Sequence, residues 1–587
     1  MASTLISPGV LAIENDQSFI TQQPVTVGAA IIGPTVKGPV ELPTIVTSYS
    51  QYQNTFGTTF TSGSDSYTYF TSIAAYNYFA NGGESLLVAR VVTGSFTPAT
   101  TDTGSVTGTN GIENAVGAPV SIMNSASLSQ SFALETISEG TIMNSVSPTG
   151  SNGTLTSGSS DNLRWVITNP DYANGTFSLV IRQANDDNNN QSVLETWTNL
   201  SLDPKADNYI ARVIGDQTLN YNSTNNQIQV SGSYPNQSRY VRVKSVDQKT
   251  PDFFSNTGLA KSEFTGSIPA AGSGSFIGAT GDLFVDGKAQ YYDKITSALY
   301  AQGLTSSSYD NMINLLSNQD DYRFNVLLTP GLFNSLQTSQ VTNIINNTQN
   351  RGDSIYVLDL VPYDSNVATV TTEAAERNTS YAASYWPWVQ TIDPDTFQRV
   401  WVPASTMIPG VYAYNDSVSE PWFAPAGINR GGLSTVVRAE QKLTQANRDS
   451  LYTGKVNPIA TFPGTGVVVY GQKTLQTKAS ALDRVNVRRL LIALKSYISQ
   501  VANNLVFEQN TIATRNAFLA QVNPYLASVQ QRQGLYAFKV VMDESNNTAD
   551  VIDRNQMVGQ IYIQPTKTAE FIYLNFNILP TGVEFPA

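Results

Sequence analysis

The chain contains neither histidine nor cysteine in its 587 residues. Without imidazole or thiol groups it cannot build a Ser-His-Asp or Cys-His nucleophile system, a histidine or cysteine zinc site, or a disulfide. Carboxylate, lysine and tyrosine chemistry stays open, but these absences argue against an enzyme. We therefore expect no catalytic, metal-binding or cofactor-binding residue and no cofactor. The missing cysteine suits a reducing cytosol, and also a particle that meets oxidising conditions after release.

Charge is scarce as well: Asp, Glu, Lys and Arg make up 13 % of the chain, and the formal net charge is −12. Binding to nucleic acid or to an anionic membrane requires a basic surface. No apolar run reaches the roughly 18 residues that a bilayer-spanning helix needs. The glycines show neither a dinucleotide-binding spacing nor a Gly-Lys-Ser/Thr phosphate loop. We expect no direct contact with nucleic acid and no small-molecule ligand.

The length allows three or four domains of about 150 residues each. Residues 23–92 and 281–420 alternate helices with short apolar strands, such as 324–329, which indicates an α/β layer with a sheet covered on both faces. Between them, residues 93–280 are rich in Ser, Thr, Asn and Gly and contain several candidate strands, 209–214 among them. This composition predicts one or two β-rich inserts that protrude from the main body.

A run of Asn and Asp residues at 185–189 separates two of the strands expected in this insert. Clustered carboxylates and amides can bind calcium, but the EF-hand spacing with glutamate at the twelfth position is absent. We interpret the run as a solvated hairpin loop.

The sharpest pattern is a long helix predicted over residues 480–506. Ser480 and Asp483 form a capping-box-like start. At helical spacing, one arc of this helix is apolar; it consists of Val487, Leu490, Leu491, Leu494, Ile498, Val501 and Leu505.

A basic stripe of Arg484, Arg488 and Lys495 lies on the flank of that arc, while Arg489 points nearly opposite it. In an acidic protein, such a stripe is suited to contact an acidic partner. The alternative is an ordinary solvated flank with local ion pairs.

Three strand-like runs follow, at 535–542, 551–563 and 570–578, and residues 1–22 resemble an extended arm without a strand to pair with. An isolated strand is not stable in water. Three strands, with an arm at each end of the chain, therefore suggest a sheet completed by strands from neighbouring molecules. The alternative is a self-contained hairpin with frayed termini.

Short motifs along most of the chain, each weak alone, occur in the order and spacing of one family. They are Ser7-Pro8-Gly9-Val10, Lys37-Gly38-Pro39, Phe56-Gly57, the stretch 381–388, Gly410-Val411-Tyr412-Ala413, Ala424-Pro425-Ala426-Gly427, Asn429-Arg430-Gly431, Val456-Asn457-Pro458-Ile459, Arg484-Val485-Asn486-Val487-Arg488-Arg489-Leu490 and Phe507-Glu508. The chain resembles the tail sheath proteins of contractile bacteriophages and of related contractile injection particles. Two central motifs are similar to the sheaths of T4-like myoviruses: Val193-Leu194-Glu195 and Asn199-Leu200-Ser201-Leu202-Asp203.

The resemblance implies an α+β multidomain protein: a subtilisin-like α/β sheath core, β-rich outer inserts, and a C-terminal α+β domain whose sheet is completed by arms of neighbouring subunits. With no histidine, the subtilisin-like fold cannot mean protease activity. The implied ranges are an N-terminal arm (1–22), an α/β sheath wall domain (23–92 with 281–420), β-rich insert domains (93–280), a C-terminal inner domain (421–564), and a C-terminal strand and arm (565–587).

The resemblance also assigns residues to these roles as hypotheses. The tail-tube contact would be the basic stripe, Arg484, Arg488 and Lys495. The inter-subunit arm strands would contain Leu5, Ile6, Val10, Leu11, Ile13, Ile572, Leu574, Phe576 and Ile578. The arm-receiving strands would contain Tyr536, Phe538, Val540, Met557 and Ile561.

The implied function is structural. Subunits polymerise into a helical sheath around the phage tail tube, and the sheath contracts to drive the tube through the host envelope during genome ejection. The energy would come from new interfaces formed as a metastable extended sheath contracts, so no nucleotide is needed. Two alternatives stay open: another polymerising virion protein (tail tube, capsid or fibre), and a carboxylate-based glycan hydrolase.

The partners implied are neighbouring sheath subunits, the tail tube protein, and baseplate and tail terminator proteins. The protein would be assembled in the cytoplasm of the bacterial host and would reside in the virion as part of the tail.

Overall fold

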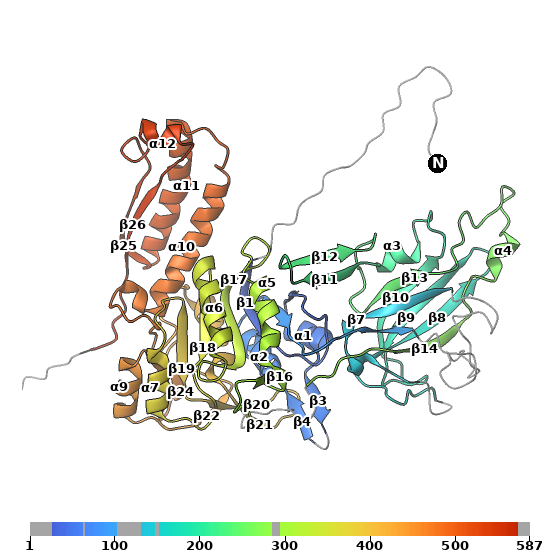
Figure 1. Ribbon diagram of the computed structural model, residues 1–587, viewed down its shortest axis with the longest axis horizontal. Coiled ribbons are helices and arrows are strands. Elements are labelled where there is room, and N and C mark those ends of the chain that lie inside the picture. The colour runs from blue at the N-terminus through green and yellow to red at the C-terminus, as the bar shows by residue number, and fades with distance from the viewer. Residues whose placement is uncertain (1–25, 63–64, 102–130, 147–151, 285–293, 573–587) are drawn as a thin grey trace, which may run out of the picture.

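The computed structural model describes residues 26–62, 65–101, 131–146, 152–284 and 294–572. Figure 1 shows an α/β body in the middle, a β-rich block to one side, and a C-terminal unit that projects from the other end of the body. The prediction of a mixed α/β multidomain protein is confirmed. No described helix is long and apolar enough to cross a bilayer.

The body is built on an eight-stranded sheet whose central strands are parallel. Its strands, in spatial order, are β2 (Thr44–Val46), β5 (Leu86–Arg90), β1 (Thr26–Gly33), β17 (Arg323–Phe333), β18 (Ile355–Asp359), β19 (Ala382–Trp386), β23 (Val456–Phe462) and β24 (Gly466–Val469). Only the two edge strands, β2 and β24, run antiparallel to their neighbours. Because β23 and β24 belong to this sheet, the sheet crosses the predicted domain boundary between 420 and 421.

Both faces of this sheet are buried, as its continuous apolar strands predict. Ala29 and Ile31 of β1 belong to one hydrophobic cluster, whereas Ala30 and Ile32 belong to another. The first face is covered by α1 (Tyr49–Phe56), α2 (Phe70–Ala80) and α8 (Ile408–Val418). The second is covered by α5 (Asp310–Leu315), α6 (Thr338–Arg351), α7 (Val367–Ala375) and α9 (Gln445–Thr453).

The β-rich block has its own seven-stranded sheet and core. The strand order is β10 (Val193–Ser201), β9 (Thr176–Gln183), β8 (Leu163–Asp171), β14 (Gly272–Ile277), β6 (Pro98–Thr101), β7 (Phe132–Glu139) and β13 (Val241–Val246). The buried guanidinium of Arg90, on β5 of the body, donates to the Glu139 carbonyl of β7 at 2.9 Å. Lys37 of the body adds an ion pair with Asp161 of the block at 3.2 Å, so more than one contact ties the block to the body here.

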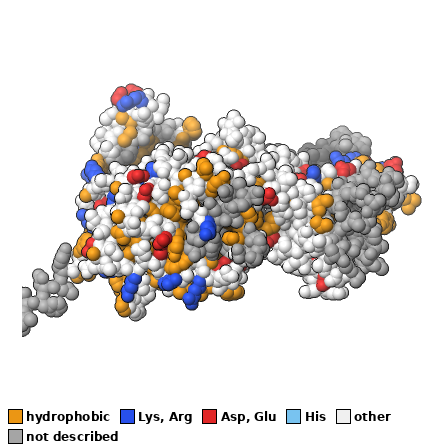
Figure 2. All heavy atoms as spheres, turned by 60° about the horizontal axis from the view of Figure 1, so that its bottom comes forward, with side chains coloured by type: hydrophobic (Ala, Val, Ile, Leu, Met, Phe, Trp, Pro, Cys, Tyr) orange, Lys and Arg blue, Asp and Glu red, His pale blue; other side chains and the backbone are white. Residues whose placement is uncertain are grey.

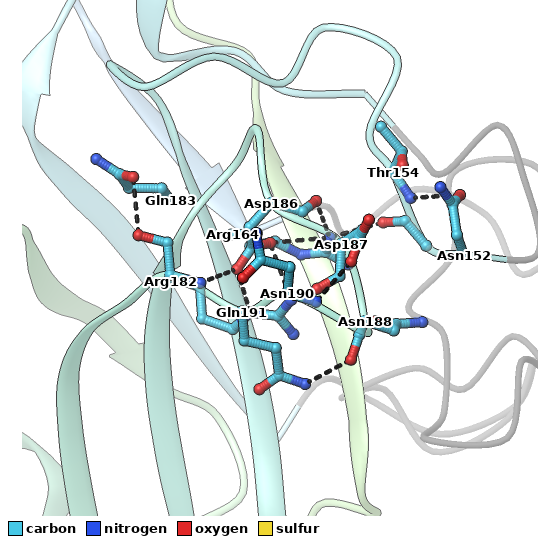
Figure 3. A network of polar contacts seen from close by, with 12 residues as sticks. Asn152, Thr154, Arg164, Arg182, Gln183, Asp186, Asp187, Asn188, Asn190 and Gln191 are labelled. Carbon is cyan, nitrogen blue, oxygen red and sulfur yellow. Dashed lines mark hydrogen bonds and ion pairs between the residues drawn. The ribbon is translucent and has the colours of Figure 1, made fainter.

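The residues 185–189 do form the hairpin loop between β9 and β10, but this loop is not solvated throughout. Figure 3 shows the Asp186 carboxylate between two arginines of the sheet. Arg182 donates to it at 2.7 and 2.9 Å, and Arg164 lies 3.4 Å away. All three side chains are buried. Asp186 neutralises two buried arginines, which gives it a structural role, and no group of three or more acidic residues among the described residues is arranged to hold a metal ion.

A two-stranded hairpin, β11 (Thr218–Asn222) with β12 (Gln227–Ser231), extends from the block back toward the body (Figure 1). Tyr221 and Ile228 of this hairpin pack against the body's second hydrophobic cluster. The hairpin therefore acts as a further attachment between block and body.

The C-terminal unit contains two long helices, which lie antiparallel to each other, and a pair of strands (Figure 1). Its elements are a short 3-10 turn (Ala481–Asp483), α10 (Val485–Asn503), α11 (Ile512–Gln531), β25 (Leu535–Val541), α12 (Ala549–Asp553) and β26 (Gln560–Pro565). The helix expected at 480–506 is confirmed in its main part, and Ser480 accepts from the backbone N–H of Leu482. The expected strand 551–563 is instead α12 followed by β26, and α11 was not predicted.

Candidate assembly site

The most prominent candidate surface in the C-terminal unit is its two-stranded sheet. β25 pairs antiparallel with β26, and one side of the pair packs on α10 and α11 through a common cluster that includes Leu494, Phe518 and Leu526. Within the described residues, neither outer edge of the pair carries a third strand. Unpaired backbone N–H and C=O groups along a strand edge are a template for pairing with another chain.

The residues predicted to receive an arm are placed differently from the expectation. Phe538, Val540, Met557 and Ile561 are half-buried in the core of the unit itself. A β-bulge between Leu535 and Ala537 interrupts the alternation by which Tyr536, Phe538 and Val540 would share one face of the strand, and the Tyr536 side chain is 61 % exposed. A partner strand could therefore meet the strand edges and Tyr536, while the other four side chains are already packed.

The predicted arm strands fall largely outside the described residues. Only Ile572 is described, and its side chain is 76 % exposed. The others lie outside the described ranges: Leu5, Ile6, Val10, Leu11, Ile13, Leu574, Phe576 and Ile578.

The basic stripe is not the exposed row that helical spacing suggested. Arg488 is 3 % exposed; its guanidinium donates to the Ser380 backbone carbonyl at 3.2 Å and lies 3.9 Å from the Tyr381 ring centroid. Burial lowers the pKa of Arg488, although Tyr381 opposes the shift. Residues 380 and 381 of the body cover that side of α10, so Arg488 is occupied within its own chain and its contact with a tube stays a prediction.

Lys495, about two helical turns beyond Arg488, is exposed. Its ammonium lies 3.3 Å from the Tyr381 hydroxyl, at the mouth of a polar cleft of about 350 Å³ between α10 and the body. Lys495 is the most exposed residue of the predicted stripe, whereas the Arg484 side chain is 24 % exposed; the contact of Lys495 with a tube stays a prediction.

Arg484, at the start of α10, is the centre of a polar cluster. Its guanidinium donates to Glu570 at 2.7 and 3.0 Å, and Asp483 lies 2.9 Å away. Tyr452 of α9 donates to the same Glu570 carboxylate at 2.7 Å, and Gln472 at 3.1 Å. Burial alone would raise the pKa of Glu570, but the hydrogen bonds from Arg484 and Tyr452 outweigh it and lower that pKa. Arg484 is therefore occupied within its own chain.

A second exposed surface, which sequence reasoning missed, lies on the body. The strands β20 (Val389–Ile392), β21 (Arg399–Val402) and β22 (Val436–Ala439) form a small sheet. Ile392, Phe397 and Val437 line a groove of about 610 Å³ there, and Phe397 is 80 % exposed. Figure 2, which brings the lower side of Figure 1 forward, shows hydrophobic side chains gathered over the body. Exposed apolar patches of this kind are typical of interaction surfaces.

Comparisons with known proteins identify the region that carries these surfaces. Residues 305–475 match the phage tail sheath protein central domain, and residues 477–579 match the phage tail sheath C-terminal domain. The tail sheath protein of Vibrio phage KVP40 is 43 % identical over 208 residues, which are 35 % of this chain and 31 % of that protein. The tail sheath protein of Enterobacteria phage T4 is 41 % identical over 185 residues, 32 % of this chain and 28 % of that protein.

The aligned region thus spans less than two thirds of the length of either relative. A crystal structure of the sheath tail protein from Listeria innocua superposes over 92 % of this chain and 96 % of its own, with a TM-score of 0.50 and 10 % identity. That likeness is one of fold. Residues 305–475 and 477–579 therefore resemble domains of phage tail sheath proteins, in agreement with the resemblance that the motifs indicate.

Proposed function

We propose that this chain is a subunit of a contractile tail sheath, which polymerises around a tail tube. One observation carries the proposal: in the region that matches the sheath C-terminal domain, β25 and β26 form a sheet of only two described strands, with both outer edges unpaired. Packing on α10 and α11 stabilises this pair, and its two open edges are a template to which strands from another chain can be added.

In this proposal the strands are supplied by the arms of neighbouring subunits, 1–22 and 565–587. The C-terminal unit lies innermost, against the tube, and the β-rich block points outward. The α/β body is the sheath wall, with a subtilisin-like arrangement of parallel strands supported by the order β5-β1-β17-β18-β19-β23. Because β23 and β24 belong to the sheet of the body, we propose a boundary with the inner domain nearer to Ser480 than to 420.

Contraction would follow from the physics of such a lattice. Head-to-tail contacts that do not close generate an open helical tube. An extended tube assembled as a metastable state is held by a kinetic barrier. When it is released, the subunits move as rigid bodies and the exchanged strands act as tethers. New contacts between subunits supply the energy, so the chain needs no nucleotide, cofactor or catalytic residue.

The partners proposed are other copies of this chain, the tail tube protein, and baseplate and terminator proteins at the two ends of the sheath. The location proposed is the virion, after assembly in the cytoplasm of a bacterial host. The exposed groove around Phe397 is a further surface suited to such contacts.

The test is electron microscopy of the purified full-length protein, alone and with a purified tail tube. Hollow, striated tubes whose bore matches the tail tube are expected. Solid fibres, closed shells or tubes of tail-tube diameter would favour another polymerising virion protein. Stable monomers that cleave a glycan would overturn the proposal.

A further inference from the structure

The chain past β26 leaves the C-terminal unit and returns to the α/β body. Residues 568–572 form one wall of a groove of about 540 Å³, whose other wall includes Tyr452, Pro458 and Tyr470 of the body. Glu570 holds this segment to the body. Its main partner is Arg484, which lies between the body and the start of α10.

This contact is stronger than an ordinary surface ion pair. Glu570 accepts four hydrogen bonds: two from Arg484, one from Tyr452 and one from Gln472. Gln472 also donates to the Thr568 hydroxyl at 2.7 Å, so two residues of the segment are held. Isolated exposed pairs contribute little, whereas bidentate arginine–carboxylate pairs with further donors fix geometry as well as energy.

The chain changes character immediately after Glu570. The next two side chains are large and apolar, yet Phe571 is 68 % and Ile572 76 % exposed. Glu570 therefore marks the last held position before an apolar stretch that the described part of this chain leaves uncovered. A surface of this kind is expected to be covered in a complex.

We propose that Glu570, clamped by Arg484, Tyr452 and Gln472, is a positioning residue that fixes where and in which direction the C-terminal segment leaves its own subunit. The partner that covers the exposed Phe571 and Ile572 is a second copy of this chain. This part of the inference rests on the proposed sheath function. A fixed exit point raises the effective concentration of the segment at the neighbouring subunit and lowers the ordering cost of binding.

The clamp itself is tested in the monomer by limited trypsin digestion. Lys567 is exposed, and cleavage after it requires Thr568 and the residues that follow to enter the protease. In Glu570→Gln the cleavage rate at Lys567 should rise about tenfold. This corresponds to a decrease of about 1.4 kcal/mol in the free energy of opening of the segment. Cleavage after the exposed Lys478, in a different loop, serves as the internal reference and should not change.

Arg484→Lys and Tyr452→Phe each remove part of the clamp and should show smaller increases. Glu570→Gln combined with Arg484→Lys should be no faster than Glu570→Gln alone, because both changes act on one contact. Glu544→Gln, on the connection between β25 and α12, is the matched control and should cleave as the wild type does. Equal cleavage at Lys567 in all variants would overturn the clamp.

Assembly is measured separately, by sedimentation of polymers over a range of concentrations. Glu570→Gln should need an about tenfold higher concentration to polymerise, and Glu544→Gln should not. If Glu570→Gln loosens the segment but polymerises normally, the segment does not act in assembly and the positioning role fails. If the wild type does not polymerise at all, the proposed function fails, while the digestion result still decides the clamp.

Discussion

Arg489 of α10 and Asp416 of α8 form an ion pair that joins the C-terminal unit to the α/β body. The Arg489 guanidinium donates to the Asp416 carboxylate and lies 4.6 Å from the Tyr412 ring centroid. Arg489 is almost fully buried, whereas Asp416 is partly exposed. Burial opposes the charge of Arg489, but Asp416 outweighs it and raises the pKa of the guanidinium. The side of α10 that the sequence predicted to face away from the core is therefore an internal contact.

We expect Asp416→Ala to loosen the attachment of α10. The substitution leaves a buried guanidinium without its carboxylate, which should cost about 2 kcal/mol once the partial exposure of Asp416 is considered. Hydrogen exchange of α10 peptides should show an about 30-fold increase in opening. Asp550→Ala, which removes the exposed pair with Arg554 in α12, is the control and should leave α10 unchanged. Equal effects of the two substitutions would contradict the role of the Arg489–Asp416 pair.

The basic stripe separates into a structural and an accessible part. Arg488→Glu places an unpaired carboxylate under Tyr381 and should destabilise the C-terminal unit by about 3 kcal/mol. Lys495→Glu changes an exposed side chain and should leave stability unchanged. Thermal unfolding measures both. Co-sedimentation with a purified tail tube then tests contact at Lys495: weaker binding of Lys495→Glu supports it, and unchanged binding assigns Lys495 to the solvated flank.

If the N-terminal arm exchanges strands between subunits, its deletion should prevent polymerisation. Removing residues 1–18 should leave a folded monomer, because the described core begins at β1, but should abolish polymerisation. Circular dichroism checks the fold and electron microscopy the polymer. Normal tubes from the truncated chain would refute strand exchange through this arm.

The open edge of β26 predicts a second assembly phenotype. Tyr562 is exposed on this strand, and Tyr562→Lys introduces the kind of charge that blocks edge-to-edge pairing. Lys539 lies directly opposite Tyr562 on β25, so repulsion between the two lysines should lower stability by up to about 1 kcal/mol and leave the unit folded. Polymer yield should fall. Val230→Lys, on the exposed hairpin strand β12, is the control, and an equal loss of polymer in both would remove the special role of β26.

Asp359 predicts a pH dependence of stability. Burial raises the pKa of this carboxyl to about 7, although hydrogen bonds from Ser405 oppose the shift. The folded state therefore holds this proton more tightly than the unfolded chain, whose ordinary Asp value is 3.8. The contribution of this carboxyl to the free energy of unfolding is therefore fully present below about pH 4, and it is lost as the pH rises to about 7.

The substitution Asp359→Asn removes this titration. The free energy of unfolding of both proteins is measured at pH 5, 6, 7 and 8. The difference between wild type and Asp359→Asn should fall with rising pH and level off above about pH 7. One carboxyl accounts for at most about 1.4 kcal/mol per pH unit. A difference that does not vary with pH would show that Asp359 titrates normally.

Two elements show where sequence patterns led to the wrong local structure. The run 209–214 is rich in β-branched and aromatic residues and predicts a strand, yet Ile210–Ile214 is the short helix α3. Ile210 and Ile214 are buried in the core of the β-rich block, and this tertiary burial overrides the local preference. The helix α11 was missed although its buried residues, Phe518, Val522 and Leu526 among them, have helical spacing. Pro524 within it obscures the pattern.

The sequence by itself determined the class of protein. The absence of histidine and cysteine removed whole groups of active sites, continuous apolar strands predicted a sheet buried on both faces, and ordered motifs indicated the family. Periodicity also placed Arg484, Arg488 and Lys495 on one flank of a helix. Only the tertiary structure decided which of them remain accessible, because periodicity defines a face but not what covers it. Arg484 meets Glu570 across 86 residues of sequence, and Arg488 meets Ser380 across 108. Such pairs form when separate elements pack together, and no local pattern records them.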